Sequence, residues 1–118
     1  MLVDRILCTT QFNKAIKTLK NKHEKEIVRD IYETVEKLSN FEITSQQDNH
    51  QLTNMNCVHD IHIRGNVVLL YRYVSNTIII TLELHNIVNH DKLNSNSQRK
   101  SLIGDASKEF KVESDIDS

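Results

Sequence analysis

The sequence predicts a small α+β domain, in which an antiparallel sheet of about four strands, ordered β-α-α-β-β-β, carries an antiparallel helix pair on one face. Two amphipathic helical stretches near the N-terminus and three later segments of alternating apolar and polar residues predict these elements. The chain of 118 residues is 38% hydrophobic, which suffices for one core. It has no proline and two glycines, which disfavours a many-turned β-sandwich.

The N-terminal third of the chain predicts one strand and two helices. Residues 2–8 are short and mostly apolar, as in a first strand that pairs with the later sheet. Thr9 or Thr10 is a good N-cap for the first helix. A stronger apolar stripe predicts a second helix from about Glu24 to Ser39. Because the connection is short, the two helices should lie antiparallel and cover the apolar face of the sheet.

Residues 57–93 predict an antiparallel meander of three strands, with tight turns at Gly65-Asn66 and Ser75-Asn76. Successive side chains of a strand point to opposite faces, so one face would be apolar and the other polar. The predicted apolar face has Ile61, Ile63, Val67, Leu69, Tyr71, Tyr73, Ile78, Ile80, Leu82 and Leu84. The predicted polar face has Asp60, His62, Arg64, Arg72, Thr81, Glu83 and His85, with His90 just beyond.

Two segments lack usable periodicity. Residues 41–56 are polar and predict a long loop, of the kind that often carries function, and this loop contains His50. After Leu93 the chain is rich in serine and acidic residues and poor in apolar ones, which predicts a tail that is disordered for the most part. We therefore expect one domain over residues 1–93 and a polar tail over residues 94–118.

Composition narrows the class of function. The net charge of −1 argues against a protein that covers long nucleic acid through nonspecific contacts, although the lysines between Lys14 and Lys25 predict a local cationic patch. Cys8 and Cys57 are too few for a disulfide framework, and zinc-like Cys/His spacing is absent from the sequence, so we expect no metal. With neither a leader pattern nor a membrane-length apolar stretch, the sequence predicts a cytoplasmic protein without membrane partners.

Three short motifs accompany this order of elements. They are DNHQL at 48–52, HIRGNVVLLYR at 62–72 and NHDKL at 89–93. Together the motifs and the element order resemble the RelE/ParE superfamily of bacterial toxins, and the YafQ-like mRNA interferase branch most of all, over about residues 4–93. The resemblance implies a type II toxin that cleaves mRNA on the ribosome and inhibits translation. It implies a cognate antitoxin, the ribosome and mRNA as partners, and no cofactor.

The resemblance also implies the catalytic residues. His50, His62 and His90 stand at the positions of the family's histidines. Imidazole titrates near neutral pH, so one histidine can act as a general base and another as a general acid without a metal ion. We expect His62 or His50 to be the base and His90 the acid.

Cationic residues would hold the RNA in the same interpretation. Arg72 or Arg64 would bind the scissile phosphate through two hydrogen bonds, and Lys14 and Lys17 would contact RNA or the ribosome. Alternation also leaves Arg72 opposite Glu83, where it could form only a cross-strand ion pair. We interpret the remaining histidines as solvated surface residues: His23, His59 and His85.

Three positions depart from the pattern of the YafQ branch. Asn66 and Val67 stand where that branch usually has an Asp-Trp pair, and Asn86 stands near an expected arginine. These departures favour two alternatives. One is a ParE-like inhibitor that docks on a partner such as DNA gyrase without cleaving RNA, and the other is a diverged, inactive toxin that only binds its antitoxin. The three histidines favour the nuclease.

Overall fold

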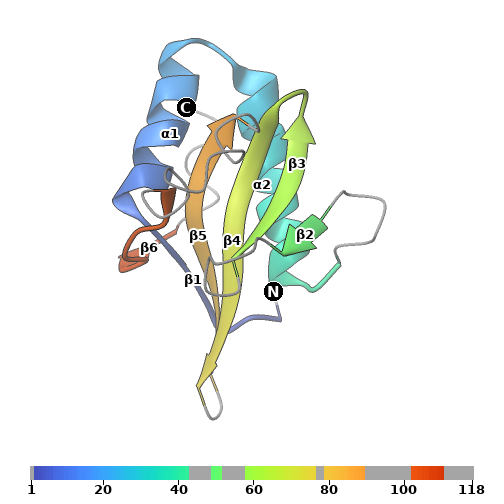
Figure 1. The fold of residues 1–118 in the computed structure, drawn as a ribbon, viewed down its shortest axis with the longest axis vertical. Helices are drawn as coiled ribbons and strands as arrows, with labels where there is room; N and C mark the ends of the chain where they lie inside the picture. The colour runs from blue at the N-terminus through green and yellow to red at the C-terminus, as the bar shows by residue number, and fades with distance from the viewer. Residues whose placement is uncertain (1, 43–48, 52–57, 77–78, 90–101, 111–118) are drawn as a thin grey trace.

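The computed structural model describes residues 2–42, 49–51, 58–76, 79–89 and 102–110. Within them, one six-stranded sheet has the strand order β2-β3-β4-β5-β1-β6, and two helices lie against it (Figure 1). The elements are β1 (Arg5–Cys8), α1 (Thr10–Asn21), α2 (Lys25–Ser39), β2 (Asn49–Gln51), β3 (His59–Arg64), β4 (Val67–Asn76), β5 (Ile79–Asn89) and β6 (Lys108–Glu109). No described helix is both long and apolar enough to cross a membrane.

The α+β class and the predicted element order are confirmed, but the sheet is mixed. β1 runs parallel to β5, with Arg5 opposite Thr81 and Cys8 opposite Leu84. The two helices account for this direction, because they return the chain to the place where β1 begins: the amides of Leu2 and Val3 donate to the carbonyl oxygen of Ser39 at the end of α2. β3 and β5 therefore run in the direction of β1. The short strands β2 and β6 extend the sheet beyond the four strands expected.

α1 begins at a predicted cap, and α2 has its predicted bounds to within one residue. Thr9 is the N-cap of α1, and its Oγ1 accepts a hydrogen bond from the amide of Phe12 at 3.0 Å. Between the helices, His23 adopts a left-handed conformation with φ 61°, and its amide donates to the carbonyl of Lys20. This tight turn lets α2 begin at Lys25 and pack beside α1.

The main core lies between the helices and the predicted apolar face of the sheet. Apolar residues recur on both helices at the helical period, so that each helix buries one side and leaves its charged residues outside. The core residues buried to more than 97% are Cys8, Phe12, Ile31, Tyr32, Val35, Leu38, Ile61, Leu69, Tyr71, Leu82 and Leu84. The predicted apolar face is confirmed for Ile61, Leu69, Tyr71, Leu82 and Leu84, with Ile63 and Ile80 packed against them, whereas Ile78 lies outside the described residues. The predicted turn at Ser75-Asn76 is wrong, because these two residues continue β4 and pair with Ile80 and Ile79.

A β-bulge in β5 ends this regular alternation. Tyr71 pairs with Leu84 but Leu70 pairs with Asn86, so His85 is the extra residue of the bulge. Beyond it, Ile87 packs against the main core while Val88 joins the opposite face. Strict alternation in the sequence does not reveal a one-residue shift of this kind.

The opposite face of the sheet carries a second, smaller apolar cluster. Four buried residues form it, Val58, Val68, Leu70 and Val88, and Leu102 and Ile103 pack against them. The sequence predicted a polar face here, and the structure shows a face that is apolar on one part and polar on another.

Residues 102–110 differ from the tail that the composition predicts. After Leu102 and Ile103 the chain reaches the outer edge of β1, where β6 pairs antiparallel with Leu7 and Cys8. Phe110 then packs against the rings of Phe12 and Tyr32, at centroid distances of 5.5 and 5.6 Å. The few apolar residues of this segment contact two different surfaces of the domain, Leu102 and Ile103 the smaller cluster and Phe110 the main core, so they show no periodicity.

Candidate active site

His62 lies on the face of the sheet that points away from the helices. It pairs across β3 and β4 with Val68, which in turn pairs with Val88 of β5. Side chains of directly paired residues share a face, and both valines belong to the second apolar cluster. The row from His62 to Val88 crosses two strand spacings, roughly 10 Å. His62 is half-buried at one end of this row.

For the other two predicted catalytic histidines, His50 and His90, the structure describes no side chain. The backbone of His50 pairs with Asp60, two residues before His62, although its side chain lies outside the described residues. His90 also lies outside them, and Asn89 before it pairs with Val67. The described strands therefore bring the backbone at 50 and at 89 to the part of the sheet that carries His62.

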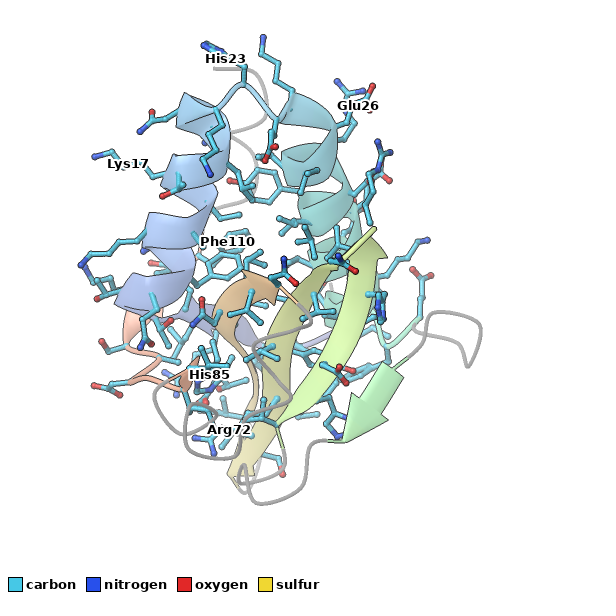
Figure 2. The ribbon with its side chains drawn as sticks, turned by 45° about the horizontal axis from the view of Figure 1, so that its top comes forward. Lys17, His23, Glu26, Arg72, His85 and Phe110 are labelled. Carbon is cyan, nitrogen blue, oxygen red and sulfur yellow. The ribbon has the colours of Figure 1, made fainter. Side chains whose placement is uncertain are left out.

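Arg72 belongs to a polar network on the same face. Its Nε donates to Oε1 of Glu83 at 2.6 Å, which is the ion pair that alternation predicted as an alternative role. Oε1 of Glu83 also lies 2.8 Å from Nε2 of His85. Figure 2 shows Arg72 and His85 close together at this end of the sheet. Arg72 follows Val68 by four residues, so its backbone lies roughly 13 Å along the strand from the partner of His62, at about 3.3 Å per residue.

The interpretation of His85 as a solvated surface residue is wrong. Its side chain is 0% exposed. Because Glu83 Oε1 already accepts from Arg72, it is an acceptor, and His85 must donate to it through Nε2. Within the described part of the chain, Nδ1 of His85 is buried without a hydrogen-bond partner. Burial lowers the pKa of His85, and this outweighs the opposing effect of the Glu83 carboxylate, so the ring is neutral at pH 7.

Arg64 does not join His62, contrary to the sequence prediction. The pairing shifts register between His62 and Arg64, so the strand no longer alternates at its end. The Arg64 guanidinium instead contacts α2, with 2.6 Å from Nη1 to Glu26 and 2.8 Å from Nε to Asp30. Its charge is engaged on the helix side of the molecule.

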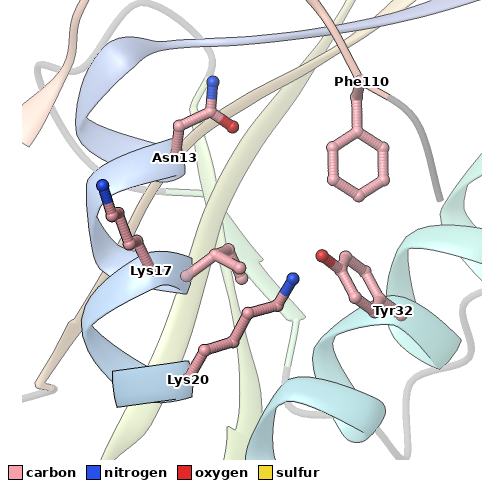
Figure 3. A pocket seen from close by; sticks show the side chains of 6 residues that line it. Asn13, Lys17, Lys20, Tyr32 and Phe110 are labelled. Carbon is pink, nitrogen blue, oxygen red and sulfur yellow. The ribbon is translucent and has the colours of Figure 1, made fainter. Parts of the chain in front are cut away.

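The two predicted cationic residues of α1 also lie on the helix side. Lys14 is exposed on α1. Lys17 borders a pocket between α1, α2 and Phe110 (Figure 3), whose other lining residues are Asn13, Ile16, Lys20 and Tyr32. The predicted phosphate-binding residues therefore do not form one surface: Arg72 shares the sheet face of His62, whereas Arg64, Lys14 and Lys17 are elsewhere.

The other two histidines differ in environment. His59 pairs with Tyr71 on the helix-facing side of β3, where the two rings stack at 5.6 Å, and burial lowers the pKa of His59. The interpretation of His59 as solvated is therefore wrong, whereas His23 in the interhelical turn is exposed as expected. Within the described residues, no three His, Cys, Asp or Glu side chains gather as a metal site would require.

The helix pair, the twisted sheet and the histidine on its open face define a small toxin-like domain of the RelE/ParE kind. Comparison with protein families identifies it further. Residues 4–95 match the profile of the family described as "Bacterial toxin of type II toxin-antitoxin system, YafQ". The chain belongs to this family, and it is a type II toxin with the family's activity, that of an mRNA interferase, which makes it an endoribonuclease.

Solved structures show the same fold. YafQ from E. coli strain BL21(DE3) superposes with a TM-score of 0.61 at 17% identity, over 76% of this chain and 97% of that one. YafQ in the E. coli DinJ-YafQ toxin-antitoxin complex gives 0.61 at 17% identity, over 80% and 100%. A copper-bound mutant toxin from Helicobacter pylori gives 0.59 at 24% identity, over 79% and 99%. No curated protein matches the chain in sequence.

Proposed function

We propose that this toxin cleaves mRNA on the ribosome by attack of an RNA 2′-hydroxyl, without a metal ion. A base removes the 2′-hydroxyl proton, the 2′-oxygen attacks the adjacent phosphorus, and the bond from phosphorus to the 5′-oxygen breaks as an acid protonates that oxygen. The products are a 2′,3′-cyclic phosphate and a free 5′-hydroxyl. Two imidazoles suffice for both proton transfers.

The position of His62 carries this proposal. It is a histidine of the family motif, half-buried on the sheet face opposite the helices, with His50 two pairing positions away in the backbone. One of these two is the base. His90 is the acid, because it follows Asn89, whose partner Val67 adjoins the partner of His62.

Arg72 supplies positive charge on the same face, farther along β4. Because its Nε is held by Glu83, the guanidinium is fixed in orientation, as suits a group that binds a neighbouring phosphate of the RNA rather than the scissile one. Arg64 has no part in this chemistry, since both of its described ion pairs are with α2. Lys14 and Lys17 would contact the ribosome or distant RNA from the helix side.

The partners follow from the same assignment. A type II toxin has a cognate antitoxin, and the complex of E. coli DinJ with YafQ has a toxin chain of this fold. The substrate and the ribosome place the site of action in the cytoplasm. Asn86, which stands near the expected arginine, is engaged in the fold, because its Nδ2 donates to the carbonyl of Leu102 at 3.1 Å.

Primer extension on mRNA from a translating extract tests the proposal. Adding the wild-type chain should create new 5′ ends within the coding region, and a His62→Ala, His90→Ala double variant should reduce them by roughly a hundredfold or more. Circular dichroism controls for the fold of the variant. If the wild type stops translation while the mRNA stays whole, the protein is an inhibitor that acts by docking.

A further inference from the structure

The segment of residues 102–110, here called the C-terminal strap, lies outside the part of the chain that the family shares. The family profile ends at residue 95. The solved structures are matched over 97 to 100% of their own chains while leaving a fifth or more of this chain uncovered. The strap nevertheless contacts the domain at three separate places, so it has a role that the shared fold does not require.

The first contact covers the candidate active-site face. Leu102 and Ile103 pack on the cluster that contains Val68, the cross-strand partner of His62. Nδ2 of Asn86 donates to the carbonyl of Leu102 and fixes the strap at the bulge of β5. The strap therefore covers apolar surface on the sheet face that carries His62.

The second and third contacts anchor the strap to the edge strand β1 and to the two helices. β6 completes the outer edge of β1, with Lys108 opposite Cys8, and the amide of Phe110 donates to the carbonyl of Ile6 at 3.0 Å. Phe110 then fills the space between Phe12 and Tyr32. Figure 2 shows Phe110 between the two helices.

From these contacts we infer that the C-terminal strap is an intramolecular cover of the RNA-binding face, which must lift from Val68 and Val88 before single-stranded RNA can lie across β3, β4 and β5. The inference takes its substrate, RNA, from the proposed function. The covering movement itself is inferred from the contacts of the strap. The cluster under Leu102 and Ile103 is small, with four buried residues. β6 and Phe110 hold it in place, so loosening either anchor raises the open fraction.

A reversible disulfide can lock the strap. Lys108 and Cys8 are directly paired on antiparallel strands, where Cα atoms lie about 5 Å apart, a distance that suits a disulfide. The full-length chain carrying Lys108→Cys would therefore form a bridge to Cys8 when oxidised and release it with a reductant. Cys57→Ser is included to prevent other pairings, and Cys57→Ser alone, treated identically, is the matched control. Phe110→Ala tests the opposite change, because it removes the ring that anchors the strap to Phe12 and Tyr32.

Two measurements distinguish the proposal about the strap from the proposal about catalysis. One is the appearance of new mRNA 5′ ends in a translating extract, and the other is binding of a fluorescent 2′-O-methyl RNA of about ten nucleotides, which cannot be cleaved. We expect the oxidised chain to bind and cleave roughly tenfold less than the same chain reduced. Phe110→Ala should exceed the wild type in both, with faster hydrogen exchange at β1, and the Cys57→Ser control should not respond to oxidation.

The strap proposal and the cleavage proposal fail in different outcomes of these experiments. Redox-dependent RNA binding without any cleavage would support the strap and refute the nuclease. Cleavage and binding that are equal in the oxidised and reduced forms would refute the strap and leave the nuclease intact. Neither binding nor cleavage in any form, including Phe110→Ala, would overturn both.

Discussion

The two faces of the sheet are covered in different ways. The helix-facing side is covered by α1 and α2, and its core residues come from elements whose apolar period is visible in the sequence. The opposite side is covered in part by Leu102 and Ile103, and it also carries the hydrogen-bonded side chains of Arg72, Glu83 and His85. The first face holds the fold together. The second combines limited packing with the groups that chemistry needs.

Strand β4 allows the strongest test of this difference in packing, because Leu69 and Leu70 are adjacent, both 0% exposed, and on opposite faces. Leu69→Ala should reduce the free energy of unfolding by about 3 to 5 kcal/mol, since it leaves a cavity in the large core. Leu70→Ala should cost about 2 kcal/mol, because the small cluster can close over the lost side chain. Urea unfolding measures both, and a larger loss at Leu70 would contradict the comparison.

The ion pairs on the two faces should also contribute differently to stability, with a smaller difference than that between the leucines. Glu83→Gln removes the carboxylate shared by Arg72 and His85 at a site that is 14% exposed, and should lower stability by roughly 1 to 3 kcal/mol. Arg64→Gln breaks pairs at a guanidinium that is 49% exposed, so it should lower stability less than Glu83→Gln does. Thermal unfolding at two salt concentrations checks this prediction. The stability loss caused by Arg64→Gln should shrink as the salt concentration rises. An equal salt dependence of the loss caused by Glu83→Gln would contradict the predicted difference between the two faces.

A pH dependence of stability should come chiefly from His85. Burial depresses its pKa in the folded state, so below the ordinary pKa of histidine the unfolded chain binds more protons than the folded one. Stability is therefore complete above about pH 6.5 and falls as the pH drops toward the folded-state value. His59, also lowered by burial, contributes in the same direction. His85→Gln should flatten the dependence measured by urea unfolding; an unchanged slope would show that His85 does not titrate with folding.

The sequence predicted what depends on local periodicity. The helix bounds, the Thr9 cap, the meander and the helix-facing side chains up to Leu84 are each set by neighbours a few residues apart. His62 and Arg72 were placed on the open face for the same reason. The face opposite the helices was predicted less well, because contacts between distant segments decide it.

Three residues show why. His85 is buried through the bulge and its hydrogen bond to Glu83, neither of which changes the apolar pattern of β5. Arg64 turns to α2 because a register shift at the end of β3 overrides alternation. Phe110 is 78 positions from Tyr32 in the chain yet packs on its ring, so composition alone led us to expect disorder there.

Two histidines of β3 test most directly that the chemistry lies on the face opposite the helices. His59 and His62 are three residues apart, on the helix-facing and open sides respectively. In a translating extract, His62→Ala should lower the rate at which new mRNA 5′ ends appear by roughly a hundredfold. His59→Ala should leave the rate within about threefold of wild type, because it loses only a ring stacked on Tyr71. Full cleavage by folded His62→Ala, or an equal loss in folded His59→Ala, would contradict the account.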